Sequence, residues 1–202
     1  MDALGQLIKA HPLSQRESKA LSKSMQSKQE DSSGFLSTVG LLSDRVLYAD
    51  RSGDGYAIWY TREMKKHLIF KSDLGISNGE AYLPPLLWKA SRNGLFLLAL
   101  ENNDRPSLDT RLYQAPFFNL CPDARFCMGN VNIKLSLNID LDQFMSQWQK
   151  LYVGSAFSHL LQGVSPVKSN IVQFWQEHIN TENPFPKKAL KRFPKLLMDI
   201  VR

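Results

Sequence analysis

Two residue types within one short segment are suited to acyl-transfer chemistry, the thiol of Cys127 and the side-chain amide of Asn119. Residues 114–128 show no helix or strand period and contain two prolines, so we expect an irregular loop with its thiols facing the surface. If the loop doubles back, Asn119, eight residues upstream, returns beside Cys127. Its amide could then donate a hydrogen bond to the oxyanion formed at a carbonyl under attack, worth ~3–4 kcal/mol. Alternatively, Asn119 is a turn residue that bonds its own backbone.

The cysteines and histidines give no sign of a metal site. Cys121 and Cys127 are too few for a disulfide scaffold or a four-thiolate zinc site, and a persistent disulfide is not expected in a reducing cytosol. By count alone they are two ordinary core thiols. A zinc site made from Cys121, Cys127 and His159 is conceivable, but no spacing supports it. We therefore expect no metal.

Composition excludes several other classes of protein. The chain has 202 residues, of which 43% are apolar, enough for one ordinary domain with a real core. No phosphate-binding glycine motif is present, so no cofactor is expected. No apolar run approaches the ~20 residues that cross a bilayer, and residues 1–12 lack a signal-type pattern. We expect a soluble, cytoplasmic protein that makes no membrane contact.

Short apolar runs separated by turn residues predict the strands that must carry the loop. Leu95–Leu100 is apolar throughout, so we expect a strand buried on both faces, and 110–113 is expected to be the returning strand. Pro84 and Pro85 exclude a central strand or a helix interior at that point. Further strands are expected at 35–42, 46–49, 56–60 and 67–70, a turn at 52–55 and a loop at 73–80.

Beyond residue 139 the pattern becomes helical. Asp140 or Asp142 can cap a helix in which apolar residues recur at three- and four-residue steps, continued after a break by 154–161. Strands followed by helices predict an α+β fold with an antiparallel sheet. Further helices are expected at 171–179 and 187–201, the latter bent or interrupted at Pro194. The expected divisions are an arm at 1–34, partly flexible or helical, a main domain at 35–165 and a helical extension at 166–202.

The net charge is +6, mildly basic and below the density of a dedicated nucleic-acid binder. Basic residues gather between 187 and 195, at spacings that would place most of them on one side of a helix. Such a cluster is most often a solvated helix face. The alternatives are a docking surface for an acidic partner or weak, non-specific DNA contact. The cluster consists of Lys187, Lys188, Lys191, Arg192 and Lys195.

The segment around Cys127 resembles the active-site stretch of the ubiquitin-conjugating (UBC-fold) enzymes. In those enzymes an Asn precedes an apolar-Cys-Leu segment by eight residues, and here Asn119 and Phe126-Cys127-Met128 keep that spacing. More closely, the chain is similar to prokaryotic UBC-like family D, the protein B component of PRTRC-type plasmid systems. The matching motifs lie between about residues 35 and 162 and are Lys66–Phe70, Leu83–Leu86, Arg105-Pro106 with Thr110, Ala115-Pro116 with Asn119, and Phe157–His159.

This resemblance implies a UBC-like antiparallel sheet with a long active-site loop, and an acyl-relay activity. Cys127 would accept a ubiquitin-like modifier as a thioester from a ThiF-like activating enzyme and pass it to an amine of a protein target. Asn119 would be the oxyanion donor. His159 would orient a loop or deprotonate the amine, the alternative being a histidine packed in the core. The implied pathway is bacterial, plasmid-borne or antiphage, and includes a metal-dependent deconjugating peptidase.

Departures from the enzyme motif keep two other functions open. The motif His is absent, because Phe117 and Phe118 precede Asn119, and Gly129 stands where an acidic residue is usual. The Trp common soon after the cysteine is also missing. The absent His and the altered residue after Cys127 favour a UBC-like scaffold without transfer activity, which docks the modifier or its activating enzyme. The basic cluster favours a plasmid-maintenance protein that contacts DNA through the arm and residues 187–195.

Overall fold

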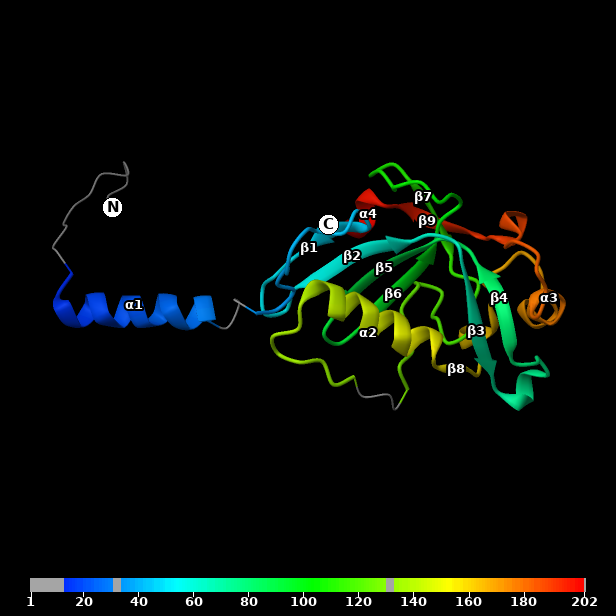
Figure 1. Ribbon diagram of the computed structural model, residues 1–202, viewed down its shortest axis with the longest axis horizontal. Helices are drawn as coiled ribbons and strands as arrows, with labels where there is room; N and C mark the ends of the chain where they lie inside the picture. Colours follow the sequence, from blue (N-terminus) through cyan, green and yellow to red (C-terminus); the bar gives the residue numbers. More distant parts are fainter. Residues whose placement is uncertain (1–12, 31–33, 130–132, 202) are drawn as a thin grey trace.

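The protein is built around an antiparallel main sheet, seen in a computed structural model that describes residues 13–30, 34–129 and 133–201 (Figure 1). Six strands of the described residues form this sheet in the order β1-β2-β5-β6-β7-β9. Helix α2 (Leu141–Val153) lies across one face (Figure 1). The strands are β1 (Val46–Ala49), β2 (Tyr56–Thr61), β5 (Leu86–Ser91), β6 (Leu95–Ala99), β7 (Arg111–Gln114) and β9 (Arg192–Leu196).

Two strands of a smaller sheet, β3 and β4, lie between β2 and β5 in the chain. This sheet has the order β4-β3-β8, formed by β3 (Met64–Phe70), β4 (Gly79–Leu83) and the short β8 (Ala156–Phe157). β4 pairs antiparallel with β3, whereas β8 pairs parallel with the end of β3. Pro84 and Pro85 join β4 to β5, so they lie between strands, as their missing N–H groups predict.

An aromatic core joins α2 to the main sheet. Asp140 caps the helix by accepting a hydrogen bond from the Gln143 backbone N–H at 2.8 Å, which confirms the predicted start. Phe144 and Tyr152 are fully buried and pack edge-on against Trp59 and Trp88 at centroid distances of 6.2 and 6.0 Å. This packing fixes α2 over β2 and β5 of the main sheet.

The remaining helices lie at the two ends of the chain. α1 (Gln15–Glu30) stands apart from the sheets in Figure 1, and α3 (Ile171–His178) packs beside β4. Residues 1–12 and 31–33 of the expected arm lie outside the described residues. The short elements are α4 (Met198–Val201) and the 3₁₀ turns η1 (Ser72–Leu74), η2 (Leu161–Gly163) and η3 (Lys187–Ala189).

The strand expected at 35–42 is wrong. Phe35 and Leu36 are buried, but Leu41 is 98% exposed and the segment has no strand. Its backbone bonds to the start of α2 instead, through Leu36 N–H to the Ile139 carbonyl and Leu141 N–H to the Ser37 carbonyl, both at 2.9 Å. The loop expected at 73–80 ends earlier than predicted, because β4 begins at Gly79.

Two expected helices are also wrong. Residues 154–161 do not continue α2, because the chain turns at Gly154 and becomes extended as β8. Residues 187–201 form η3, β9 and α4, so the 166–202 segment is not purely helical and supplies an edge strand of the main sheet. Pro194 breaks a helix but is tolerated on an edge strand, because it has no N–H to donate.

Candidate functional site

The Cys127 loop doubles back on itself as a tight hairpin. The Cys127 backbone N–H donates to the Asn119 carbonyl at 2.9 Å, and Cys121 N–H donates to the Arg125 carbonyl at 2.8 Å. Between these pairs, Leu120 and Phe126 form an isolated antiparallel bridge. The sequence predicts Asn119 beside Cys127 only if the loop doubles back, and the structure shows that it does. It brings Asn119 and Cys127 directly opposite one another.

The hairpin is held against the main sheet by β6. Phe126 N–H donates to the Leu95 carbonyl at 2.8 Å, and Leu97 N–H donates to the Ala124 carbonyl at 3.0 Å. Phe126 is buried and packs edge-on against Tyr152 of α2, with ring centroids 5.0 Å apart. Because side chains alternate along an extended segment, its neighbour Cys127 turns away from the core and is half-buried.

Asn119 connects the hairpin to the segment that follows α2. Its backbone has φ +61°, a left-handed conformation that asparagine tolerates better than most residues. Its side-chain oxygen accepts hydrogen bonds from the backbone N–H groups of Ser158 at 3.1 Å and His159 at 3.3 Å. Its Nδ2 donates to the Ala156 carbonyl at 3.0 Å. The structure thus brings all three predicted site residues, Cys127, Asn119 and His159, into one hydrogen-bonded unit.

The same contacts fix the proton position on His159, whose side chain is exposed. Ser158 Oγ lies 2.9 Å from Asn119 Oδ1 and 2.8 Å from His159 Nδ1. An amide oxygen only accepts, so the Ser158 hydroxyl donates to it, and the serine oxygen accepts from His159 Nδ1–H. Nε2 of the neutral ring then carries the free lone pair, as a base requires. Ser158 belongs to the Phe157–His159 motif, but nothing in the sequence indicates this role.

Cys121 lies on the same hairpin in a more apolar setting. It lines a small cavity of about 20 Å³ together with Leu97, Leu120 and Val164. Burial and the nearby Asp123 carboxylate raise the pKa of the Cys121 thiol, which disfavours its thiolate. Both cysteines are free thiols. Among the described residues, no three His, Cys, Asp or Glu side chains gather in a way that could hold a metal ion.

Phe117 and Phe118, which stand where the enzyme motif has its His, pack in the hydrophobic core. Phe117 stacks on Phe157 and Trp175, with centroid distances of 5.6 and 5.7 Å. Trp175 Nε1 donates to the Pro116 carbonyl at 2.8 Å in a buried contact. The start of the loop is therefore fastened to α3. This role was missed from the sequence, although the apolar run at 117–118 was its signal.

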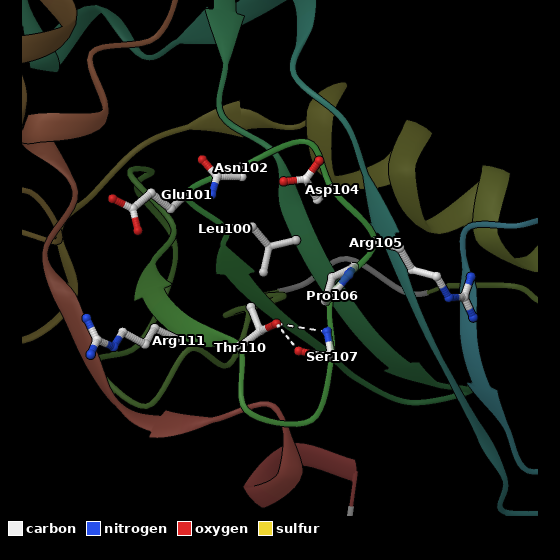
Figure 2. Close-up of a pocket in the computed structure, with 9 residues that line it drawn as sticks. All are labelled: Leu100, Glu101, Asn102, Asp104, Arg105, Pro106, Ser107, Thr110 and Arg111. Carbon is white, nitrogen blue, oxygen red and sulfur yellow. Dashed lines mark hydrogen bonds between the residues drawn. The ribbon is translucent and has the colours of Figure 1, made fainter.

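A larger hollow of about 340 Å³ lies where β6 connects to β7, and shares no residue with the hairpin (Figure 2). Thr110 Oγ1 accepts from the Ser107 N–H at 2.8 Å there, which fixes the turn. Arg105 points toward β1, where its guanidinium donates to the carbonyls of Asp44 and Val46. These contacts give the Arg105-Pro106 and Thr110 motif a structural role, that of joining the connection to the edge of the sheet.

The basic cluster at 187–195 does not form one helix face. Lys187 stands on η3 and donates to Asn102 Oδ1 at 3.2 Å, whereas Lys191 is half-buried and donates to the Ser165 carbonyl at 3.3 Å. Arg192 and Lys195 belong to β9. The interpretation as a helical stripe is therefore wrong, because strand β9 interrupts it.

No helix in the described part of the chain is long and apolar enough to cross a membrane.

Comparison with known proteins gives one informative result. Neither the curated proteins nor the solved structures contain a significant match. The family model for Prokaryotic E2 family D matches residues 17–193, most of the chain and including the whole hairpin. The fold, the returning loop and this match agree, and the chain belongs to Prokaryotic E2 family D.

Proposed function

We propose that this protein is a conjugating enzyme that carries a ubiquitin-like modifier as a thioester on Cys127. Membership of a prokaryotic E2 family supports a role of this general kind. The observation that carries the specific proposal is the 2.9 Å hydrogen bond between Cys127 N–H and the Asn119 carbonyl. It holds the half-buried Cys127 opposite Asn119, on a hairpin fastened to β6.

Loading is a transthiolation. The Cys127 thiolate attacks the carbonyl carbon of the modifier's thioester on a ThiF-like activating enzyme. A new carbon–sulfur bond forms at Cys127, the old one breaks, and the activating enzyme's cysteine leaves as a thiolate. The exchange is nearly isoenergetic, because one thioester replaces another. Cys121 is a poorer carrier, because burial raises its thiol pKa.

Transfer is an aminolysis. A target amine attacks the thioester carbonyl, a carbon–nitrogen bond forms, and the Cys127 thiolate leaves. Asn119 Nδ2 carries two hydrogens and one is bonded to the Ala156 carbonyl, so the second is the candidate donor to the oxyanion. His159 Nε2 accepts the proton released by the amine, in the tautomer that Ser158 fixes.

The test is an intact-mass measurement of this protein after incubation with a ThiF-like activating enzyme, its ubiquitin-like modifier and ATP. We expect a mass increase equal to the modifier minus water, removed by thiol reductant. Cys127→Ala abolishes the adduct, whereas Cys121→Ala on the same hairpin retains it. If the activating enzyme is charged and this protein gains no mass, the relay is refuted.

We propose a scaffold without transfer activity as the second candidate. The observation that favours it is the use of Phe117, in place of the motif His, as a core residue stacked on Trp175. In that case the protein docks the modifier or its activating enzyme, and Cys127→Ala leaves cellular function intact.

We place either activity in a cytoplasmic bacterial pathway, plasmid-borne or antiphage, that includes a metal-dependent deconjugating peptidase. We also propose, from the sequence resemblance, that this protein is the protein B component of a PRTRC-type plasmid system.

A further inference from the structure

A groove of about 450 Å³ separates β3 from α2, and it shares no residue with the Cys127 hairpin. Figure 1 shows β3 and α2 with β8 at one end of the space between them. Met64, Ile69 and Val153 supply part of its apolar lining, and the buried ring of Trp88 also lines it. Consecutive residues of β3, Lys66 and His67, both line it. Because consecutive side chains point to opposite faces, the groove runs along the edge of β3 and not along one face.

Hydrogen bonds show which backbone groups of β3 point into the groove. Phe70 N–H donates to Asn78 Oδ1 on the β4 side, and Lys71 N–H donates to the Phe157 carbonyl on the β8 side. Backbone groups alternate along a strand, so those of His67 point to the same side as those of Lys71.

The residue that faces His67 in β4 also indicates that the backbone groups of His67 point away from β4. His67 faces Glu80, whose backbone N–H and carbonyl both bond to Asn180 rather than to β3. β8 pairs only with Ile69 and Phe70. Within the described part of the chain, the backbone N–H and carbonyl of His67 therefore form an open sheet edge, at which a further strand can pair.

Charge indicates what kind of strand this edge takes. Lys66, His67 and Lys150 line the groove, and no Asp or Glu does. Lys66 and Lys150 form no ion pair with any described residue. A segment with carboxylates would complement these cations, and apolar side chains on its other face would cover the apolar lining.

We propose that this groove binds an extended acidic segment of a partner protein, which adds as a strand to the edge of β3. The edge of β3 that β8 leaves unpaired runs from Met64 to Leu68, about 16 Å at ~3.3 Å per residue. It can pair with about five residues of the partner. Main-chain hydrogen bonds supply affinity and alternate side chains supply specificity, as in other strand additions. The proposal does not depend on Cys127 chemistry.

The test uses a phage-displayed library of random heptapeptides, selected against the full-length protein. We expect enrichment of sequences that alternate β-branched with acidic residues. Peptides made from them should bind His67→Pro at least ten-fold more weakly, because proline removes the edge N–H and cannot pair there. His67→Ala is the matched control and should bind these peptides more tightly than His67→Pro, since both variants lose the imidazole but only His67→Ala keeps that N–H.

A second pair of variants tests charge. Lys150→Glu should weaken binding at least ten-fold, and Lys168→Glu, an exposed lysine outside the groove, should leave it unchanged. Unchanged thermal midpoints show that the variants are folded. The proposal is overturned if nothing is enriched, or if the peptides bind His67→Pro and His67→Ala equally. It is also overturned if the wild type dimerises through this edge and His67→Pro is a monomer, because the occupant is then a second copy.

Discussion

Asn119 combines an unusual backbone conformation with a fully used side-chain oxygen, and both can be tested. In Asn119→Ala the N–H groups of Ser158 and His159 lose their acceptor, and the left-handed φ of +61° becomes strained. We expect the free energy of unfolding in urea to fall by about 2–4 kcal/mol. Asn119→Gly removes the strain alone and should recover about 1 kcal/mol. Equal losses in the two variants would show that the backbone is unstrained.

Ser158 selects the tautomer of His159 through its hydrogen bond to the ring Nδ1. In Ser158→Ala the ring loses its acceptor at Nδ1, so the free lone pair at Nε2 is no longer favoured. If the conjugating function holds, single-turnover discharge to a free amine should slow about 3–10-fold near neutral pH, with loading of Cys127 unchanged. Ser155→Ala is the matched control, because its hydroxyl donates to the Tyr152 carbonyl instead. A discharge pH profile unaltered by Ser158→Ala would contradict the role.

Cys121 differs from an ordinary thiol in a way that alkylation kinetics can measure. Burial and Asp123 raise its pKa, so at neutral pH it holds less thiolate than an unstructured cysteine. In Cys127→Ala, we expect the iodoacetamide reaction at Cys121 to have a pH midpoint above that of a cysteine peptide. Asp123→Asn removes one of the causes and should lower the midpoint. A midpoint at or below that of the peptide would contradict this assignment.

At the scale of elements, β9 is part of the fold rather than a surface attachment. It pairs with β7, and Phe193 is buried in a cluster with Ile58, Leu98 and Leu112 on the sheet face opposite α2. Phe193→Ala should therefore lower the free energy of unfolding by about 3–5 kcal/mol. Lys195→Ala, an exposed neighbour on the same strand, should change it by less than about 0.5 kcal/mol. Urea denaturation of both variants measures the difference.

At the scale of the whole molecule, α1 stands apart from the sheets, and its described side chains are exposed (Figure 1). We expect deletion of residues 1–33 to leave the thermal midpoint within about 2 °C of the full chain, because the described side chains of this segment, those of residues 13–22, are exposed. Deletion of residues 1–37 also removes Phe35 and Leu36, which are 1% and 0% exposed, and should lower the midpoint by more than 10 °C. Equal midpoints for the two deletions would refute this division.

The sequence alone determined the features that depend on neighbouring residues. The period of 144–152 and the cap at Asp140 predicted α2, and the apolar run at 95–100 predicted β6. The two prolines at 84 and 85 excluded a central strand or a helix interior there, and the residues around Asn119 and Cys127 led to the family that the match supports. Caps, turns and periodicity act over a few residues, so the chain itself encodes them.

Only the tertiary structure decided features that need a distant partner. Whether 192–196 is helix or strand depended on β7, and residues 156–157 became a strand because β3 lies beside them. The tautomer of His159 required Asn119, which is 40 residues away in the chain. The open edge of β3 follows from how far β8 extends. Long-range pairing and packing override local propensity, because burying apolar area and satisfying backbone groups outweigh the ~1 kcal/mol differences in propensity.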